Sequence, residues 1–147
     1  MRIIQTGFII FLAALVAPPS ARAAGSSSVH ALLISASNQK GAADPRLAPY
    51  EATLRRNLPF ESFRYVDEGS AAVAGSAPAT LSLGRSHRLE LAGERSSGRG
   101  IRVSVKWFDG SRELLSTTLV LQPGVPAVLG RRGGNEAEVP VVILTAR

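Results

Sequence analysis

The stretch IRVSVKWFDGSRELLSTTLVL, residues 101–121, decides the fold. Its first part, 101–107, alternates apolar and polar side chains, which is typical of a strand with one buried face. The dipeptide Asp109-Gly110 follows, and it favours the tight turn of a β-hairpin. Alternation resumes over 115–121, so the stretch predicts two antiparallel strands joined by a short turn.

Two registers of this hairpin are open. A two-residue loop places Val103 opposite Ser116, whereas a loop longer by one residue places Val105 opposite Leu115. We favour the second register because it sets apolar residues opposite each other, and a one-residue slip would turn the apolar set to solvent. The residues of the second strand expected to face the core are then Leu115, Thr117, Leu119 and Leu121.

Further short strands separated by turns are expected on both sides of this hairpin. They cover residues 29–35, 60–67, 81–83 and 89–91 before it, and 125–129 and 139–145 after it. The last of these is apolar on both faces and is expected to be a central strand. Its pairing is expected to begin at Val141, because Pro140 has no N–H to donate. The small residues of 70–78 predict either an edge strand or a loop.

One short helix is expected near the start. Asp44-Pro45 is a capping residue followed by proline at the first helical position. Pro49 conflicts with a continuous helix, so a tight turn at 44–48 and a helix at about 49–57 are expected, ended by Pro59. About seven strands with this helix predict a mainly β chain, either an antiparallel β-sandwich or a small barrel.

The N-terminus has the features of a secretory signal peptide over residues 1–23. Arg2 supplies positive charge, 8–17 is an apolar run, and Ala21-Arg22-Ala23 fits the small-x-small cleavage rule. The run is shorter than the ~20 residues of a bilayer span, and an uncleaved anchor is the alternative. We expect a flexible leader at 24–28, a single β-rich domain at 29–147, no membrane span after cleavage, and a periplasmic or secreted location.

Composition excludes several kinds of site. The 147 residues include 17 Lys+Arg and 11 Asp+Glu, for a net charge of +6. Loss of residues 1–23 removes two arginines and no acid, which leaves a mildly basic +4. The absence of cysteine excludes disulfides, thiolate nucleophiles and cysteine-ligated metals. Since only two histidines are present, a histidine-rich metal site is excluded. We expect no metal and no cofactor.

The candidate catalytic residues are few. His30 and His87 are the two possible histidine bases, and neither lies in a nucleophile-elbow pattern such as GxSxG. We therefore expect a chain that is not an enzyme. The alternative is a hydrolase that uses His87 with a nearby serine, and it predicts that His87→Ala abolishes an activity while leaving stability intact.

Basic residues supply the candidate contact surface. Arg88, Arg102 and Lys106 could align on the outer face of a sheet, and Arg131-Arg132 lie in a glycine-rich loop whose amides could receive a carboxylate or phosphate. Scarce aromatic residues and export argue against nucleic acid. The weakly patterned segment 71–79 could accept a partner strand, although Pro78 also resembles protection against pairing.

Three stretches carry a resemblance to other proteins: LRRNLPFESFR at 54–64, LSLG at 81–84 and LVLQPGVPAVLG at 119–130. From Leu47 to Ala146 the pattern resembles small exported β-proteins of Gram-negative bacteria with no assigned function. The resemblance rests on strands and turns, so no site residue carries over. It implies a protein of the cell envelope that is accessory to a larger assembly.

These observations favour a non-enzymatic binding or accessory protein of the bacterial cell envelope. We expect it to be a monomer when isolated and to contact another envelope protein. The alternative is a small-ligand or polysaccharide-binding domain. Sugar sites often use an exposed aromatic platform, for which the available residues are Phe60, Phe63, Tyr65 and Phe108.

Overall fold

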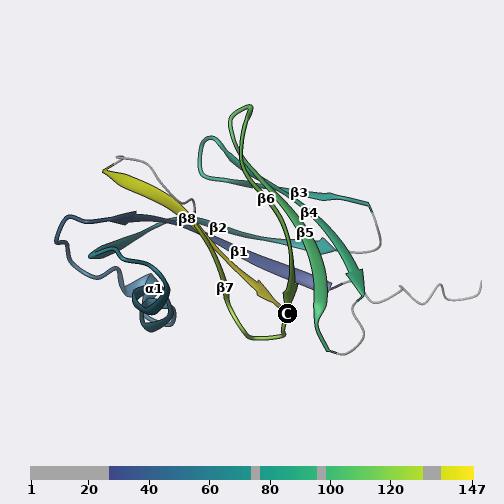
Figure 1. Ribbon diagram of the computed structural model, residues 1–147, viewed down its shortest axis with the longest axis horizontal. Helices are drawn as coiled ribbons and strands as arrows, with labels where there is room; N and C mark the ends of the chain where they lie inside the picture. Colours follow the sequence, from purple (N-terminus) through teal and green to yellow (C-terminus); the bar gives the residue numbers. More distant parts are fainter. Residues whose placement is uncertain (1–26, 74–76, 96–98, 131–136) are drawn as a thin grey trace, which may run out of the picture.

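Two antiparallel sheets of four strands pack face to face in the computed structural model, which describes residues 27–73, 77–95, 99–130 and 137–147 (Figure 1). The elements in chain order are β1 (Ser27–Ser37), the 3₁₀ turn η1 (Pro45–Leu47), α1 (Glu51–Asn57), β2 (Ser62–Val73), β3 (Ala79–Leu83), β4 (His87–Arg95), β5 (Ile101–Asp109), β6 (Arg112–Leu121), β7 (Ala127–Gly130) and β8 (Glu138–Ala146). Sheet A has the order β2-β1-β8-β7, and sheet B has the order β3-β4-β5-β6.

The predicted β-sandwich is therefore confirmed, with eight strands in the described part of the chain instead of about seven. The signal peptide predicted at 1–23 lies outside the described residues, as do residues 24–26 of the predicted leader. Ser27 and Ser28 belong to β1 and not to a flexible leader, because they pair with Val73 and Ala72 of β2.

The β5–β6 hairpin has a register two residues beyond the predicted one. Trp107 lies opposite Leu115, and a bulge at Leu114 separates this pair from Phe108 opposite Glu113. The turn residue Gly110 has a φ of 61°, which glycine adopts without strain. Because the error is an even number of residues, the faces are unchanged, and the odd-numbered residues 115–121 face the core as predicted.

Strand β1 is buried on both faces. Its inner residues Val29, Ala31 and Leu33 join the core between the sheets, which is built around Trp107. Its outer residues form a second core with the residues of η1 and α1: the β1 members are Leu32, Ile34 and Ala36. The helical segment thus covers the outer face of sheet A (Figure 1).

The helical segment follows the predicted pattern closely. Asp44 caps η1, which occupies the predicted turn at 44–48. Helix α1 begins at Glu51, two residues later than predicted, because Pro49 lies in the turn before it. It ends at Asn57, and Leu58 is extended before Pro59, as expected for a residue that precedes proline.

Strand β8 is central, between β1 and β7, as predicted. Its pairing with β1 begins at Glu138 and includes Pro140 opposite Ser35, so the predicted start at Val141 is wrong on this side. On the β7 side the pairing does begin at Val141, opposite Gly130. A proline lacks one donor only, and that loss leaves the ladder toward the other neighbour intact.

The two sheets meet closely where β2 approaches β3 and β4. A Cβ built on Gly93 would overlap Cγ1 of Val73, and one built on Gly69 would lie 2.9 Å from Cδ1 of Leu81. Asp67 Oδ2 also accepts a hydrogen bond of 2.7 Å from the N–H of Gly84. The described end of the segment 71–79, considered above as an edge for a partner, therefore packs against sheet B through the buried Val73.

Adding one methyl group at this junction should loosen it. We expect Gly93→Ala to lower the free energy of unfolding by about 1–3 kcal/mol, the usual cost of overpacking a filled core. Urea denaturation measures this, and Val73→Ala in the same chain should recover part of the loss because it removes the overlapping methyl. Equal stability of Gly93→Ala and the wild type would contradict the close approach of the sheets.

Candidate functional site

Sheet A extends past sheet B at the end of β1 that precedes the helical segment (Figure 1). A polar cleft is lined by residues of both sheets at this end. Along the inner face of β1, the apolar Leu33 is followed by Ser35 and Ser37. Both serines pair with polar residues of β2, and Ser37 also pairs with Glu138 of β8. The cleft has a volume of about 320 Å³. Its polar lining comprises Ser35, Arg64 and Glu138 from sheet A, and His87, Asp109 and Arg112 from sheet B.

The sheet A wall is organised around one carboxylate. Glu138 Oε2 accepts hydrogen bonds from Ser35 Oγ at 3.2 Å and from Arg64 Nη2 at 3.3 Å. Both charged side chains are more than half exposed, at 67% for Arg64 and 56% for Glu138, so solvent weakens the ion pair. Replacing this ion pair by contacts with a ligand therefore requires little free energy.

A second hollow of about 300 Å³ shares these three residues with the cleft. Its additional polar lining includes Lys40 and Ser62, whose hydroxyl donates to the carbonyl oxygen of Gln39 at 2.8 Å. The concave polar surface thus continues beyond the Arg64–Glu138 pair toward the start of the helical segment.

The sheet B wall is organised around the buried Trp107. Its indole Nε1 donates to Nδ1 of His87 at 3.2 Å, and the ring centroids are 5.8 Å apart. Since Nδ1 accepts this bond, the neutral form of His87 carries its proton on Nε2. Asp109 Oδ1 accepts from Ser86 Oγ at 2.7 Å. Arg112 is exposed and forms no ion pair with the described residues.

The other histidine lies elsewhere. His30 is 8% exposed on the outer face of sheet A, where its Nε2 lies 3.0 Å from Oε2 of Glu68. Within residues 27–147, the described ranges show neither histidine hydrogen-bonded to a serine hydroxyl. The same ranges contain no group of three or more His, Cys, Asp or Glu side chains that could hold a metal ion.

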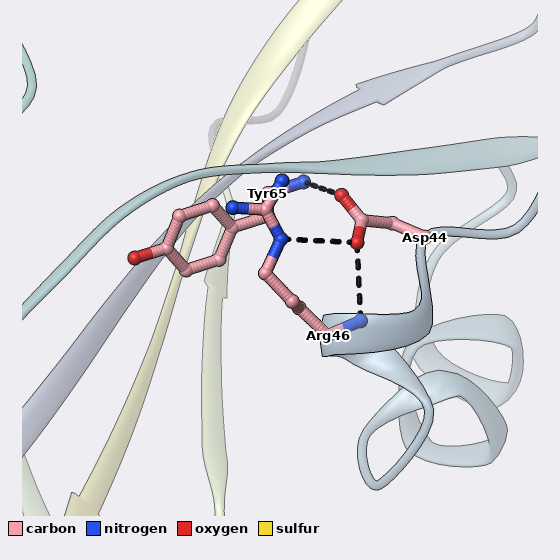
Figure 2. Close-up of polar contacts among 3 residues, drawn as sticks. All are labelled: Asp44, Arg46 and Tyr65. Atoms are coloured by element: carbon pink, nitrogen blue, oxygen red, sulfur yellow. Dashed lines mark hydrogen bonds and ion pairs between the residues drawn. The ribbon is translucent and has the colours of Figure 1, made fainter.

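Asp44 anchors the helical segment beside the second hollow (Figure 2). Its Oδ1 accepts from the backbone N–H of Arg46 at 3.1 Å and from the Arg46 Nε–H at 3.3 Å, while Oδ2 accepts from the Tyr65 N–H at 3.1 Å. The Arg46 guanidinium also lies over the Tyr65 ring, 4.2 Å from its centroid. These contacts join η1 to β2.

The same contacts perturb two titrating groups. The backbone N–H of Arg46 is the main cause that lowers the pKa of Asp44 from 3.8, although partial burial opposes it. Burial raises the pKa of the Tyr65 phenol above 10.0, and the negative charges of Glu68 and Asp67 add to this effect. The ionised Asp44 and the neutral Tyr65 are therefore the forms that the fold favours.

The predicted contact residues lie on a different surface. Arg88, Arg102 and Lys106 share the outer face of sheet B, as proposed from their spacing. Glu90 lies opposite Lys106 and its Oε1 is 3.7 Å from Nη2 of Arg88, whose guanidinium also covers the Phe108 ring at 4.7 Å. This face thus mixes charges of both signs. Arg131 and Arg132 lie outside the described residues.

The aromatic side chains considered for sugar binding are largely used in packing. Phe63 is 7% exposed, and Phe60 and Tyr65 pack against the same core beneath the helical segment. Phe108 is half-buried beneath Arg88. Across the described residues these four positions offer no fully exposed aromatic platform, which removes the feature that the polysaccharide alternative requires.

The residues of the cleft were missed as a group. Arg64, Glu138, Asp109 and Arg112 are far apart in the sequence, and three of them lie at strand ends or beside turns, where charge usually indicates solvation. The available signal was the inner-face change from Leu33 to Ser35 and Ser37, which breaks an otherwise apolar alternation.

A scan against protein-family models found no match, and searches of curated proteins and of solved structures found none either. In the part of the chain that the structure describes, no helix combines the length and apolar character that crossing a membrane requires.

The Asp44 anchor should make stability depend on acidity. Because its pKa is lowered in the folded state, its contribution is present above the unfolded value of 3.8 and is lost as the pH falls through the folded value. We expect Asp44→Asn to lower the urea midpoint at neutral pH and to approach the wild type in acid. Glu61→Gln, at an exposed carboxylate, controls for the lost charge. If the difference in urea midpoint between Asp44→Asn and the wild type does not become smaller in acid, this role of Asp44 is contradicted.

His87 should contribute to stability. We expect His87→Ala to lower the free energy of unfolding by about 1–3 kcal/mol, because the buried Trp107 N–H loses its acceptor. Urea denaturation followed by tryptophan fluorescence measures this, and His87→Gln, which retains an acceptor, should recover part of the loss. The hydrolase alternative requires the opposite result, an unchanged stability.

Proposed function

We propose that this chain is an exported, non-enzymatic binding protein of the bacterial cell envelope that is accessory to another envelope protein. The observation that carries the proposal is the inter-sheet cleft, in which charged groups from both sheets face one concavity of about 320 Å³. Export rests on the N-terminal sequence, which provides a positive charge, an apolar run and a cleavage pattern.

The chemistry of the cleft suits recognition of a polar surface. Arg64 and Arg112 present planar guanidinium groups, which pair with carboxylates in a bidentate manner. Glu138 and Asp109 supply acceptors beside them, so a partner needs groups of both signs. Charged groups arranged in this way give specificity and faster association more than raw affinity.

The histidine contacts favour binding over hydrolysis. A serine hydrolase needs a histidine nitrogen hydrogen-bonded to the nucleophile and the other oriented by an acid. Nδ1 of His87 is instead occupied by the Trp107 N–H, and His30 is paired with Glu68 on the far face of sheet A. Both histidines thus have contacts that stabilise the fold.

A small polar ligand is the second candidate for the same cleft. Its volume lies at the lower end of the ~300–1,000 Å³ that ligand pockets occupy. A sugar polymer is less favoured, because the aromatic side chains available for stacking are packed or covered.

Charge reversal separates the two candidate contact surfaces. We expect Arg64→Glu with Arg112→Glu to weaken partner binding roughly tenfold or more, since reversal places like charges in contact. The matched control is Arg102→Glu with Lys106→Glu, which makes the same change of net charge on the outer face of sheet B. The measurement is affinity capture from the native envelope with mild cross-linking, followed by titration of the purified partner.

Loss of binding in the control alone would move the contact to the outer face of sheet B. Equal binding by both variants and the wild type would exclude both surfaces. The absence of any enriched protein would favour the small-ligand candidate and direct the search to metabolite screening.

A further inference from the structure

The sandwich has four edge strands, and they differ in how they are protected. Strands β2 and β3 pack together at the close junction of the two sheets, where Gly69 contacts Leu81. Strand β7 has only four residues and follows Pro126 directly. Short edges and nearby prolines are devices that discourage pairing with other chains. The remaining edge strand, β6, is long.

Strand β6 carries little protection along its length. It has ten residues, and Leu114–Leu121 contains neither a charge nor a proline. Its one irregularity is the bulge at Leu114, near its start. Among the described strands, β5 is its sole partner in sheet B, so the other edge of its backbone is unpaired by them. A flat, uncharged edge of this length is a template for strand addition.

The two faces of β6 impose a pattern on any added strand. On the inner face, Leu115 and Leu119 are only partly buried against the core between the sheets. On the outer face, Ser116 and Thr118 are exposed, and Val120 is 47% exposed. An added strand must therefore be uncharged, with apolar side chains inside and hydroxyl or small apolar side chains outside.

We propose that this edge pairs with β6 of a second copy of the chain, antiparallel about a two-fold axis at Thr117. In this arrangement Leu115 lies opposite Leu119 of the other copy, and Ser116 lies opposite Thr118. Apolar residues thus meet inside, where they cover each other, and hydroxyls meet outside. The pair Ser104 and Thr118, whose hydroxyl oxygens are 3.2 Å apart, already makes this kind of contact within sheet B.

The charge of the chain favours this position for self-association. Two copies of a protein with a net charge of +6, or +4 after signal cleavage, repel each other over most of their surfaces. The segment 114–121 has no charge, so the repulsion is smallest there. A two-fold axis also uses the same patch on both copies and closes the assembly at two.

This dimer is independent of the proposed partner contact. The cleft includes Arg112 and Leu114 at the start of β6, whereas the dimer contact is centred on Thr117 and uses the outer backbone edge of that strand. The sequence led us to expect a monomer when isolated, and it offered the segment 71–79 as the edge that could accept a partner strand. The structure instead turns that end of β2 into the sandwich and leaves β6 at the edge.

Analytical ultracentrifugation of the mature chain over a range of concentrations tests the proposal. The wild type should show a monomer–dimer equilibrium. Ser116→Lys with Thr118→Lys places lysines opposite each other across the axis and should raise the dissociation constant roughly tenfold or more. The matched control, Thr80→Lys with Ser82→Lys, adds the same charge to exposed positions of β3, at the other edge of the same face, and should dimerise like the wild type.

A third variant keeps the test valid if two lysines disturb folding. Ser116→Lys with Thr118→Glu adds no net charge and sets opposite charges across the axis, so it should dimerise at least as well as the wild type. Since the chain has no cysteine, Thr117→Cys should form a disulfide dimer under mild oxidation, while Thr80→Cys on β3 should not.

A wild-type chain that remains monomeric at about 1 mM, a concentration that detects even very weak association, would overturn the proposal. So would a dimer that the lysine pair leaves unchanged. A dimer sensitive to the lysine pair but lacking the Thr117→Cys cross-link would overturn the axis at Thr117. Binding of another protein's strand to a monomeric wild type would assign the edge to a different occupant, leaving the cleft proposal untouched.

Discussion

The structure depends on the burial of β1 on both faces. A strand whose consecutive side chains from Ala31 to Ile34 are all apolar must be covered from two sides. Sheet B provides one cover and the helical segment provides the other. Asp44 is central to the second cover, because its carboxylate ties η1 to β2 and so holds Leu47 and Leu54 over sheet A.

The same strand explains why a polar cleft exists. The helical segment covers the outer face of sheet A as far as Ala36, whereas sheet B stops earlier on the inner face. Beyond that point an apolar inner residue would be exposed, and the chain carries Ser35 and Ser37 there instead. The cleft therefore exists because the helical segment covers more of the outer face of sheet A than sheet B covers of the inner face. The hairpin turns of sheet B form its second wall.

The sequence pattern of neighbouring residues predicted most strands and the helical segment. It did not predict contacts between residues that are far apart in the sequence. Pro49 and Pro59 fix the helical segment because proline restricts its own backbone and that of the preceding residue, and this part of the prediction is confirmed. The hairpin faces were also predicted correctly, but the register was not, since the bulge at Leu114 adds a residue to β6 that the alternation of apolar and polar residues does not indicate. The cleft joins Arg64, His87 and Glu138, which no local pattern connects.

Small residues allow the two sheets to pack closely at one side of the sandwich, where β2 meets β3 and β4. The segment around Gly69 to Val73 has weak strand character when it is considered alone, because its side chains offer little to pack. Against sheet B the same feature is an advantage, since Gly69 and Gly93 let Leu81 and Val73 approach the opposite backbone. On the opposite side, toward β6 and β7, the described parts of the two sheets make fewer contacts with each other. Leu115 and Leu119 remain partly exposed on that side, which gives β6 apolar side chains without a cover as well as an unpaired backbone edge.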